Sequence, residues 1–144
     1  MQAVHTLAGF SLLEHTADIG IEAWGPTLGS LFEQTAQGLR HLLIGPSPVA
    51  PDKQHQVQLE AEDIGELLVT WLNEVIFLFE TRNLVPGEFR VERVNENELH
   101  AVLHTEAYTP KRHVVEHQVK AATYHQLFLK QGPDGWHARI YLDL

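Results

Sequence analysis

The clearest structural signal in the chain is the run Asp63-Ile64-Gly65-Glu66-Leu67-Leu68-Val69-Thr70-Trp71-Leu72-Asn73-Glu74-Val75-Ile76-Phe77-Leu78-Phe79. Its apolar residues recur every three or four positions and form one stripe: Ile64, Leu67, Leu68, Trp71, Leu72, Val75, Leu78 and Phe79. This period is typical of an amphipathic helix. Asp63 with Glu66 three residues later matches the capping box that begins many helices. The run therefore predicts a helix whose apolar face packs against a sheet.

Glu74 lies on the shoulder of this predicted helix, roughly 90° from the centre of the apolar stripe at about 100° per residue. A carboxylate at that position is either solvated at the edge of the buried face or in contact with a partner. Both interpretations stay open on the sequence alone. Glu74 is therefore a candidate contact residue.

Two short apolar runs, Phe10–His15 and Ile19–Trp24, precede this helix. In the second, apolar and polar residues alternate, which is typical of a strand with one buried face. The two runs are predicted to pair as adjacent strands. After them, Thr27 can cap another helix over residues 28–43, which ends at Gly45-Pro46.

The rest of the chain is rich in strand signals. Residues 57–59 suggest a short strand, and the runs Phe89–Val94 and Leu99–His104 predict a hairpin. The segment Gln118–Lys130 alternates over a long span, and a turn rich in Gly and Pro separates it from a last alternating strand over residues 136–144. The predicted fold class is α+β: one domain over residues 1–144, with an antiparallel or mixed sheet packed against two amphipathic helices.

The composition limits the classes of function. The 144 residues include no cysteine, which excludes disulfides and thiolate metal sites and fits a reducing, cytoplasmic location. Ten Lys and Arg against 19 Asp and Glu give a formal charge of −9. Phosphate binding depends on clusters of Lys and Arg, so independent binding of RNA or DNA is not expected. The longest apolar stretch is too short and too interrupted to cross a membrane.

Three carboxyl groups lie near the ends of the chain. Asp18 occupies the bend between the two N-terminal strands, and Asp143 precedes Leu144, whose terminal carboxylate is the third group. If the first and last strands meet, these groups converge. Clustered carboxylates without cysteine favour hard divalent cations, with Ca²⁺ expected first and Mg²⁺ or Mn²⁺ as alternatives. The other interpretation of Asp18 is a surface residue that stabilises a turn.

Motifs that carry catalysis are missing from the sequence. It has no Walker loop, no nucleophile elbow, no G-x-G-x-x-G and no H-E-x-x-H, so no catalytic residue is predicted. His113 and His117 have a spacing that binds zinc on a helix, but the valines around them favour strand or loop. Lys120 and His125 could transfer a proton or contact an anion, although a lysine on the wet face of a strand is the more common case.

Several motifs in order along the chain resemble the archease family. They are His15-Thr16-Ala17-Asp18-Ile19-Gly20, Ala23-Trp24-Gly25, Trp71-Leu72-Asn73-Glu74, Val119-Lys120-Ala121-Ala122-Thr123-Tyr124-His125 and Leu142-Asp143-Leu144. The resemblance runs almost from end to end. It implies a small α+β protein related to strand-helix-strand-strand modules.

The resemblance also implies an accessory role rather than an enzymatic one. Archeases look like activators of RtcB-type RNA ligases in tRNA splicing or RNA repair. The resemblance therefore implies that this chain promotes ligase guanylylation and repeated turnover. The family holds a divalent cation through residues that match Asp18, Asp143 and Leu144 here. Glu74 and Lys120 also fall on motif positions, as contact residues of less specific role. The expected partner is an RtcB-type ligase, with RNA reached only through it.

Two other classes of function remain open on the sequence. One is a metal-dependent hydrolase that acts alone, with a base such as His125 beside a metal-activated water. The other is a chaperone-like interaction module whose metal is incidental. Turnover by the isolated chain distinguishes the first, and partner binding that survives loss of both aspartates distinguishes the second.

Overall fold

The computed structural model describes residues 7–14 and 18–144. Its elements are β1 (Gly9–Glu14), β2 (Ile19–Gly25), α1 (Leu28–Ile44), β3 (Lys53–Glu60), α2 (Ile64–Arg82), β4 (Leu84–Val94), β5 (Glu98–Ala107), β6 (Ala121–Ala122), β7 (Phe128–Gly132) and β8 (Gly135–Asp143). The predicted α+β class with two helices is confirmed. No helix within the described ranges is long and apolar enough to span a membrane.

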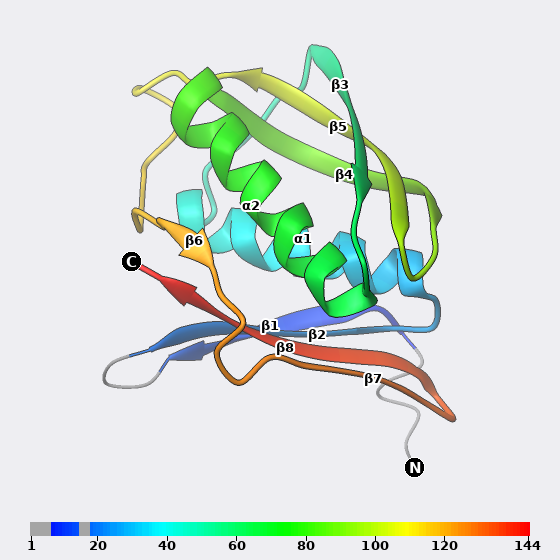
Figure 1. Ribbon diagram of the computed structural model, residues 1–144. Coiled ribbons are helices and arrows are strands. Elements are labelled where there is room, and N and C mark those ends of the chain that lie inside the picture. Colours follow the sequence, from blue (N-terminus) through cyan, green and yellow to red (C-terminus); the bar gives the residue numbers. More distant parts are fainter. Residues whose placement is uncertain (1–6, 15–17) are drawn as a thin grey trace.

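The strands form two antiparallel sheets rather than one. The larger has the order β1-β2-β8-β6, with β7 also pairing with β8, and the smaller has the order β3-β5-β4. Both helices lie between the two sheets (Figure 1). The outer face of the larger sheet, which carries alternate side chains of β2 and β8, points away from the helices.

Local signals set the helix starts. The Thr27 side chain accepts a hydrogen bond from the Ser30 backbone N–H (3.0 Å), and the Asp63 side chain accepts one from the Glu66 N–H (2.8 Å), as predicted from their capping patterns. The Glu66 carboxylate reaches back to the Glu62 N–H (2.6 Å), one residue before the cap. Each cap satisfies a backbone donor that the helix itself leaves without a partner.

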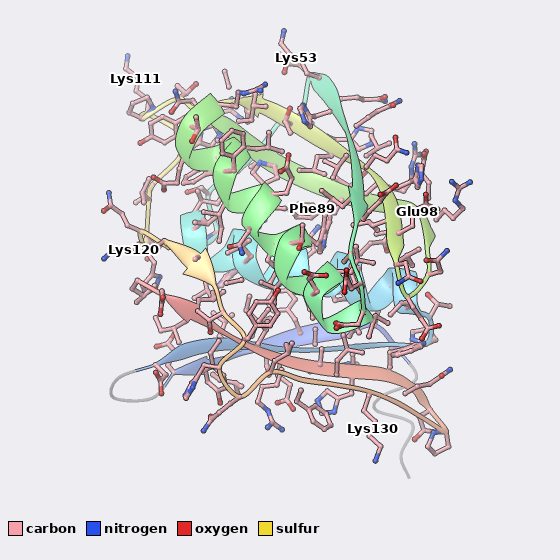
Figure 2. The ribbon with its side chains drawn as sticks, viewed as in Figure 1. Lys53, Phe89, Glu98, Lys111, Lys120 and Lys130 are labelled. Carbon is pink, nitrogen blue, oxygen red and sulfur yellow. The ribbon has the colours of Figure 1, made fainter. Side chains whose placement is uncertain are left out.

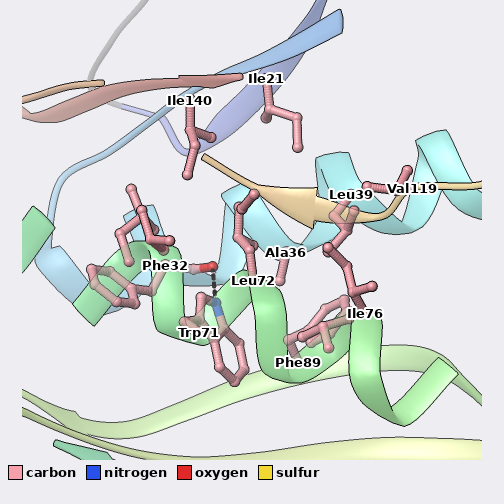
Figure 3. Packing of buried hydrophobic residues seen from close by; sticks show 14 of the residues in the cluster. Ile21, Phe32, Ala36, Leu39, Trp71, Leu72, Ile76, Phe89, Val119 and Ile140 are labelled. Carbon is pink, nitrogen blue, oxygen red and sulfur yellow. Dashed lines mark hydrogen bonds between the residues drawn. The ribbon is translucent and has the colours of Figure 1, made fainter. Parts of the chain in front are cut away.

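The core lies between the layers and joins all of them. Ile21 and Ile140 of the larger sheet, Phe32 of α1 and Trp71 of α2 are fully buried. The Trp71 indole N–H donates to the Phe32 carbonyl at 2.9 Å and so links the two helices directly (Figure 3). Burial of large apolar side chains such as these stabilises the fold by about 1.5–3 kcal/mol each.

The segment that alternates over residues 118–130 does not form one continuous strand. Only Ala121–Ala122 and Phe128–Gly132 are strands, both along one edge of β8. Between them the Thr123 hydroxyl donates to the Tyr141 carbonyl (3.1 Å), and Gln126 has φ 53°, in the left-handed region. That conformation breaks the extended backbone, which the alternation of side chains does not reveal.

The hairpin prediction is confirmed, but its first strand begins earlier than expected. β4 starts at Leu84, directly after Asn83 ends α2 in the left-handed conformation (φ 56°). Pro86 and Gly87, which resemble a turn in sequence, lie inside this strand at a shift in its register with β5. A proline is accommodated at such an irregularity because no ladder hydrogen bond is required of it there.

Candidate metal and partner site

The register of β2 and β8 brings the two ends of the described chain together. In this antiparallel pair Ile21 lies opposite Ile140 and Ile19 opposite Leu142. The ladder ends at that pair, and the same register continued by one residue would set Asp18, which precedes β2, opposite Asp143. Residues directly opposite each other in an antiparallel pair share a face of the sheet. Both aspartates are solvent-exposed, and their parity puts them on the outer face.

An aromatic and a histidine adjoin this end of the outer face. Tyr141 lies two residues before Asp143, and its ring covers Gly20, where a Cβ would come within 2.8 Å of the ring. A side chain at Gly20 would therefore displace the ring. The exposed His125 ring packs edge-on against Tyr141, with 6.4 Å between ring centroids. The structure thus brings His125 close to the same edge as Asp143.

Lys120 lies on the other side of β8. Ala121 of β6 is paired with Asp143, and the Lys120 backbone N–H donates to the Asp143 carbonyl at 2.8 Å. Its side chain is exposed and extends from β6 away from the body of the protein (Figure 2). Lys120, just before β6, therefore adjoins Asp143 on one side of β8, and Asp18, just before β2, lies on the other side of that strand.

A cavity of about 560 Å³ opens beside the last residue. It is lined by α2 between Asn73 and Thr81, by residues 118–121 and by Leu144. The α2 carboxylate that lines it is Glu80. Glu74, selected from the sequence, is half-buried elsewhere on the helix and does not line the cavity.

Sequence reasoning did not single out Asn73, which makes the most specific contact in this region. Its side-chain oxygen accepts a hydrogen bond from the Ala122 N–H at 2.8 Å, and its amide nitrogen lies 3.5 Å from the Ala122 carbonyl oxygen. These contacts attach β6 to α2. The local sequence around Asn73 contains no sign of them, because Ala122 is 49 residues away.

The donor chemistry at this end of the sheet fits a hard cation. Asp18, Asp143 and the Leu144 carboxylate offer oxygen atoms only. Ca²⁺ takes about 6–8 oxygen ligands, so backbone carbonyls and water would complete its shell. Within residues 7–14 and 18–144, no three Asp, Glu, His or Cys side chains lie together in a way that could hold a metal ion. The residues 15–17 of the predicted motif lie outside the described ranges.

His113 and His117 do not form a metal pair. The buried His113 accepts the Thr109 N–H at Nδ1 (2.9 Å), which leaves the proton on Nε2 to donate to Glu106 (3.1 Å). The Nδ1 atom of His117 lies 3.0 Å from the Leu42 carbonyl oxygen. Both rings thus bind neighbouring segments of the fold, in a region without helix.

The buried Glu106 joins two loops away from the candidate site. Its carboxylate accepts the Ala50 N–H (2.7 Å) as well as bonds from His113 and Arg112 (2.7 Å). The Ala50 hydrogen bond, followed by those from His113 and Arg112, holds the pKa of Glu106 below its ordinary value although burial acts against this. This cluster has a structural role.

Comparison with known proteins identifies the family. Residues 10–144 match the model of the Archease protein family (MTH1598/TM1083). The archease of Methanosarcina acetivorans is 39% identical over 139 residues, covering 94% of this chain and 95% of the relative. That of Thermococcus kodakarensis is 37% identical over 136 residues, covering 91% and 95%.

Solved structures agree with this match. The solution structure of protein 1598 of Methanobacterium thermoautotrophicum has a TM-score of 0.80 and 29% identity, covering 94% of this chain and 99% of that one. The crystal structure of an archease from Thermotoga maritima, at 22% identity and a TM-score of 0.55, shares the fold over 92% of this chain and 94% of that one. The chain therefore belongs to the archease family.

Proposed function

We propose that this chain is a metal-binding accessory protein that activates an RtcB-type RNA ligase in tRNA splicing or RNA repair. In this role it promotes guanylylation of the ligase and repeated turnover in the cytoplasm, and it meets RNA only through the ligase. The chain itself supplies no catalytic residue. Ca²⁺ is the favoured cation, with Mg²⁺ or Mn²⁺ as alternatives.

The observation that carries this proposal is the meeting of β2 and β8 at their ends. Their register supports a shared position for Asp18 and Asp143 at the exposed end of an open sheet, beside Leu144. Carboxylates placed together repel one another, and a bound cation offsets that repulsion. Membership of the archease family supports the same residues as the cation ligands.

Each residue has a defined part in the proposal. Asp18, Asp143 and the Leu144 carboxylate would hold the cation, which supplies concentrated positive charge at a surface that a partner can reach. Lys120 and His125 flank these residues on adjoining segments and would contact the partner. Glu74 stays a candidate contact on α2, although it does not line the cavity beside Leu144.

A second candidate is a chaperone-like interaction module. The Thermotoga maritima archease is described as a "possible chaperone". In this chain Phe77 is 45% exposed and Val115 38% exposed, and both line cavities along α2. Exposed apolar side chains gathered in one region are typical of protein interaction surfaces.

One reconstitution separates these functions. Purified chain is assayed with and without an RtcB-type ligase, GTP and divalent metal, on RNA with ligatable ends. The proposal expects faster guanylylation and multiple turnover only when the chain, ligase and metal are all present. Ligase rates that do not respond to the chain would contradict it, and hydrolysis by the chain alone would favour an independent enzyme. Activation that persists in Asp18→Asn/Asp143→Asn would favour the interaction module.

A further inference from the structure

The Asn73 side chain contacts the backbone of Ala122 in the way that a neighbouring strand would. Its side-chain oxygen accepts the Ala122 N–H at 2.8 Å, and its amide nitrogen faces the Ala122 carbonyl at 3.5 Å. One primary amide thus accepts the backbone N–H and approaches the carbonyl oxygen of a single residue at the edge of a sheet. An adjacent strand would provide the same donor and acceptor.

β6 is too short to hold its own position. Only Ala121 and Ala122 are paired with β8, and single hydrogen bonds from the Lys120 and Thr123 N–H groups flank this pair (2.8 and 3.0 Å). Short isolated strand pairs are marginally stable in water. The Asn73 contacts attach this short strand to α2, beside the buried side chains of Val119 and Ala122.

Asn73 follows two residues of α2 that are held in place by the core. The two residues before it, Trp71 and Leu72, are fully buried, and Trp71 is hydrogen-bonded to α1. The position of Asn73 is therefore set by the core. Side chains on such elements hold a site more precisely than loop residues do.

We propose that Asn73 is a positioning residue for the cation site at the end of β8. Through Ala122 it fixes β6, and through the bond from Lys120 it fixes the backbone of Asp143 and hence Leu144 after it. Asn73 also lines the cavity beside Leu144, although it is not itself a ligand. This inference rests on the proposed function, because it assigns Asn73 to the proposed cation site.

The competing role is purely structural. In that case loss of Asn73 would lower the stability of β6 but leave the affinity for a cation unchanged, because β2 and β8 alone would position the ligands. A positioning role predicts weaker cation binding by protein that is still folded. The two roles therefore differ in calcium affinity and not in stability.

The test compares Asn73→Leu, which removes both contacts, with Asn73→Asp, which keeps the acceptor for the Ala122 N–H. Thr81→Val is the matched control, since Thr81 lies on α2 and lines the same cavity. Calcium affinity is measured by calorimetry, and the hydrogen exchange of the Lys120 and Ala122 amides is measured without calcium. If circular dichroism shows that the Asn73→Leu variant does not fold, Asn73→Ser is used in its place.

Asn73→Leu is expected to speed exchange at both amides and to weaken calcium binding by about tenfold. Asn73→Asp should keep slow exchange at Ala122 and bind calcium at least as well as the parent, since it also adds a negative charge. Parent-like calcium affinity in Asn73→Leu would overturn the positioning role alone. No calcium binding by the parent would overturn the proposed cation site and this role with it.

Discussion

Ile19 of β2 lies opposite Leu142 of β8, and this is the last pair of the ladder that joins the first and last parts of the chain. Both side chains face the core, and the residues beyond them, one just before β2 and one at the end of β8, are exposed. Those residues are Asp18 and Asp143. Their placement follows from the register and leads to the first prediction.

Calcium should raise the melting temperature of the parent chain, and Asp18→Asn/Asp143→Asn should abolish that rise. A ligand present at about 100 times its Kd stabilises the folded state by about 2.7 kcal/mol, or on the order of 8 °C for a domain of this size. Differential scanning calorimetry with calcium and with EDTA measures the rise in melting temperature. The control Asp52→Asn/Glu96→Gln removes two exposed acids elsewhere and should keep the rise. An unchanged rise in the first variant would show that the site is wrong.

A C-terminal extension of a few residues should weaken calcium binding and ligase activation. It converts the Leu144 carboxylate into a neutral peptide group, while the buried Ala138, Ile140 and Leu142 prevent the strand from shifting to compensate. The same tag at the N-terminus is the control and should be tolerated. Calorimetric titration of calcium into both tagged forms measures the effect. Equal calcium affinities would show that Leu144 is not a ligand and would leave the two aspartates as the proposed site.

Radiolabelled GTP should mark only the ligase when ligase, chain and metal are incubated together. Activation then requires contact with the metal face of this chain and no covalent step on it, because the sequence has no activated nucleophile. Denaturing gels of the mixture and of each protein alone show where the label resides. Stable label on this chain would contradict the accessory role.

Glu106→Gln should destabilise the protein at neutral pH and have a smaller effect in acid. The folded-state pKa of Glu106 lies below its ordinary value of 4.5, chiefly through the Ala50 hydrogen bond. Its contribution is therefore fully present above that ordinary value and is lost as the pH falls through the lower folded-state value. Urea denaturation at pH 7 and at pH 3 measures the difference in the free energy of unfolding between the parent and the variant. A deficit that is equal at both pH values would show that ionisation of Glu106 is not the cause.

Trp71→Phe should lower the free energy of unfolding by roughly 1–3 kcal/mol, since it removes the hydrogen bond to Phe32 and leaves unfilled volume in the core. Urea denaturation followed by far-UV circular dichroism measures this. Trp136→Phe is the control, because Trp136, near the start of β8, is only partly buried, and this variant should lose less than half as much. Equal losses would mean that the link between the helices contributes little.

Much of the secondary structure could be predicted because its causes are local. The apolar stripe and the Asp63 cap predicted a helix over 63–79, and α2 spans Ile64–Arg82. Thr27 and the apolar period after it predicted α1 equally well. A helix is defined by contacts within four residues, so its sequence contains nearly all the information needed.

The breaks in strands and the division into two sheets depended on contacts that are distant in the chain. Alternation over 118–130 is compatible with one strand. In the structure the Ala122 N–H donates to Asn73, the Thr123 hydroxyl donates to Tyr141, and the left-handed Gln126 interrupts the extended backbone. Pairing between β2 and β8 joins residues more than a hundred positions apart. Strand order and register arise from such pairings, which a local pattern does not encode.

The candidate site shows the same division. The sequence by itself determined which carboxylates are available, that no thiolate can bind a metal, and that Asp143 alternates with core residues on the last strand. Only the tertiary structure decided that β2 pairs with β8 in the register that leads Asp18 towards Asp143, and that Asn73 bonds to Ala122 beside that edge. The physical reason is that residue type and period are properties of a segment, whereas a site requires the register between segments that fold together from opposite ends of the chain.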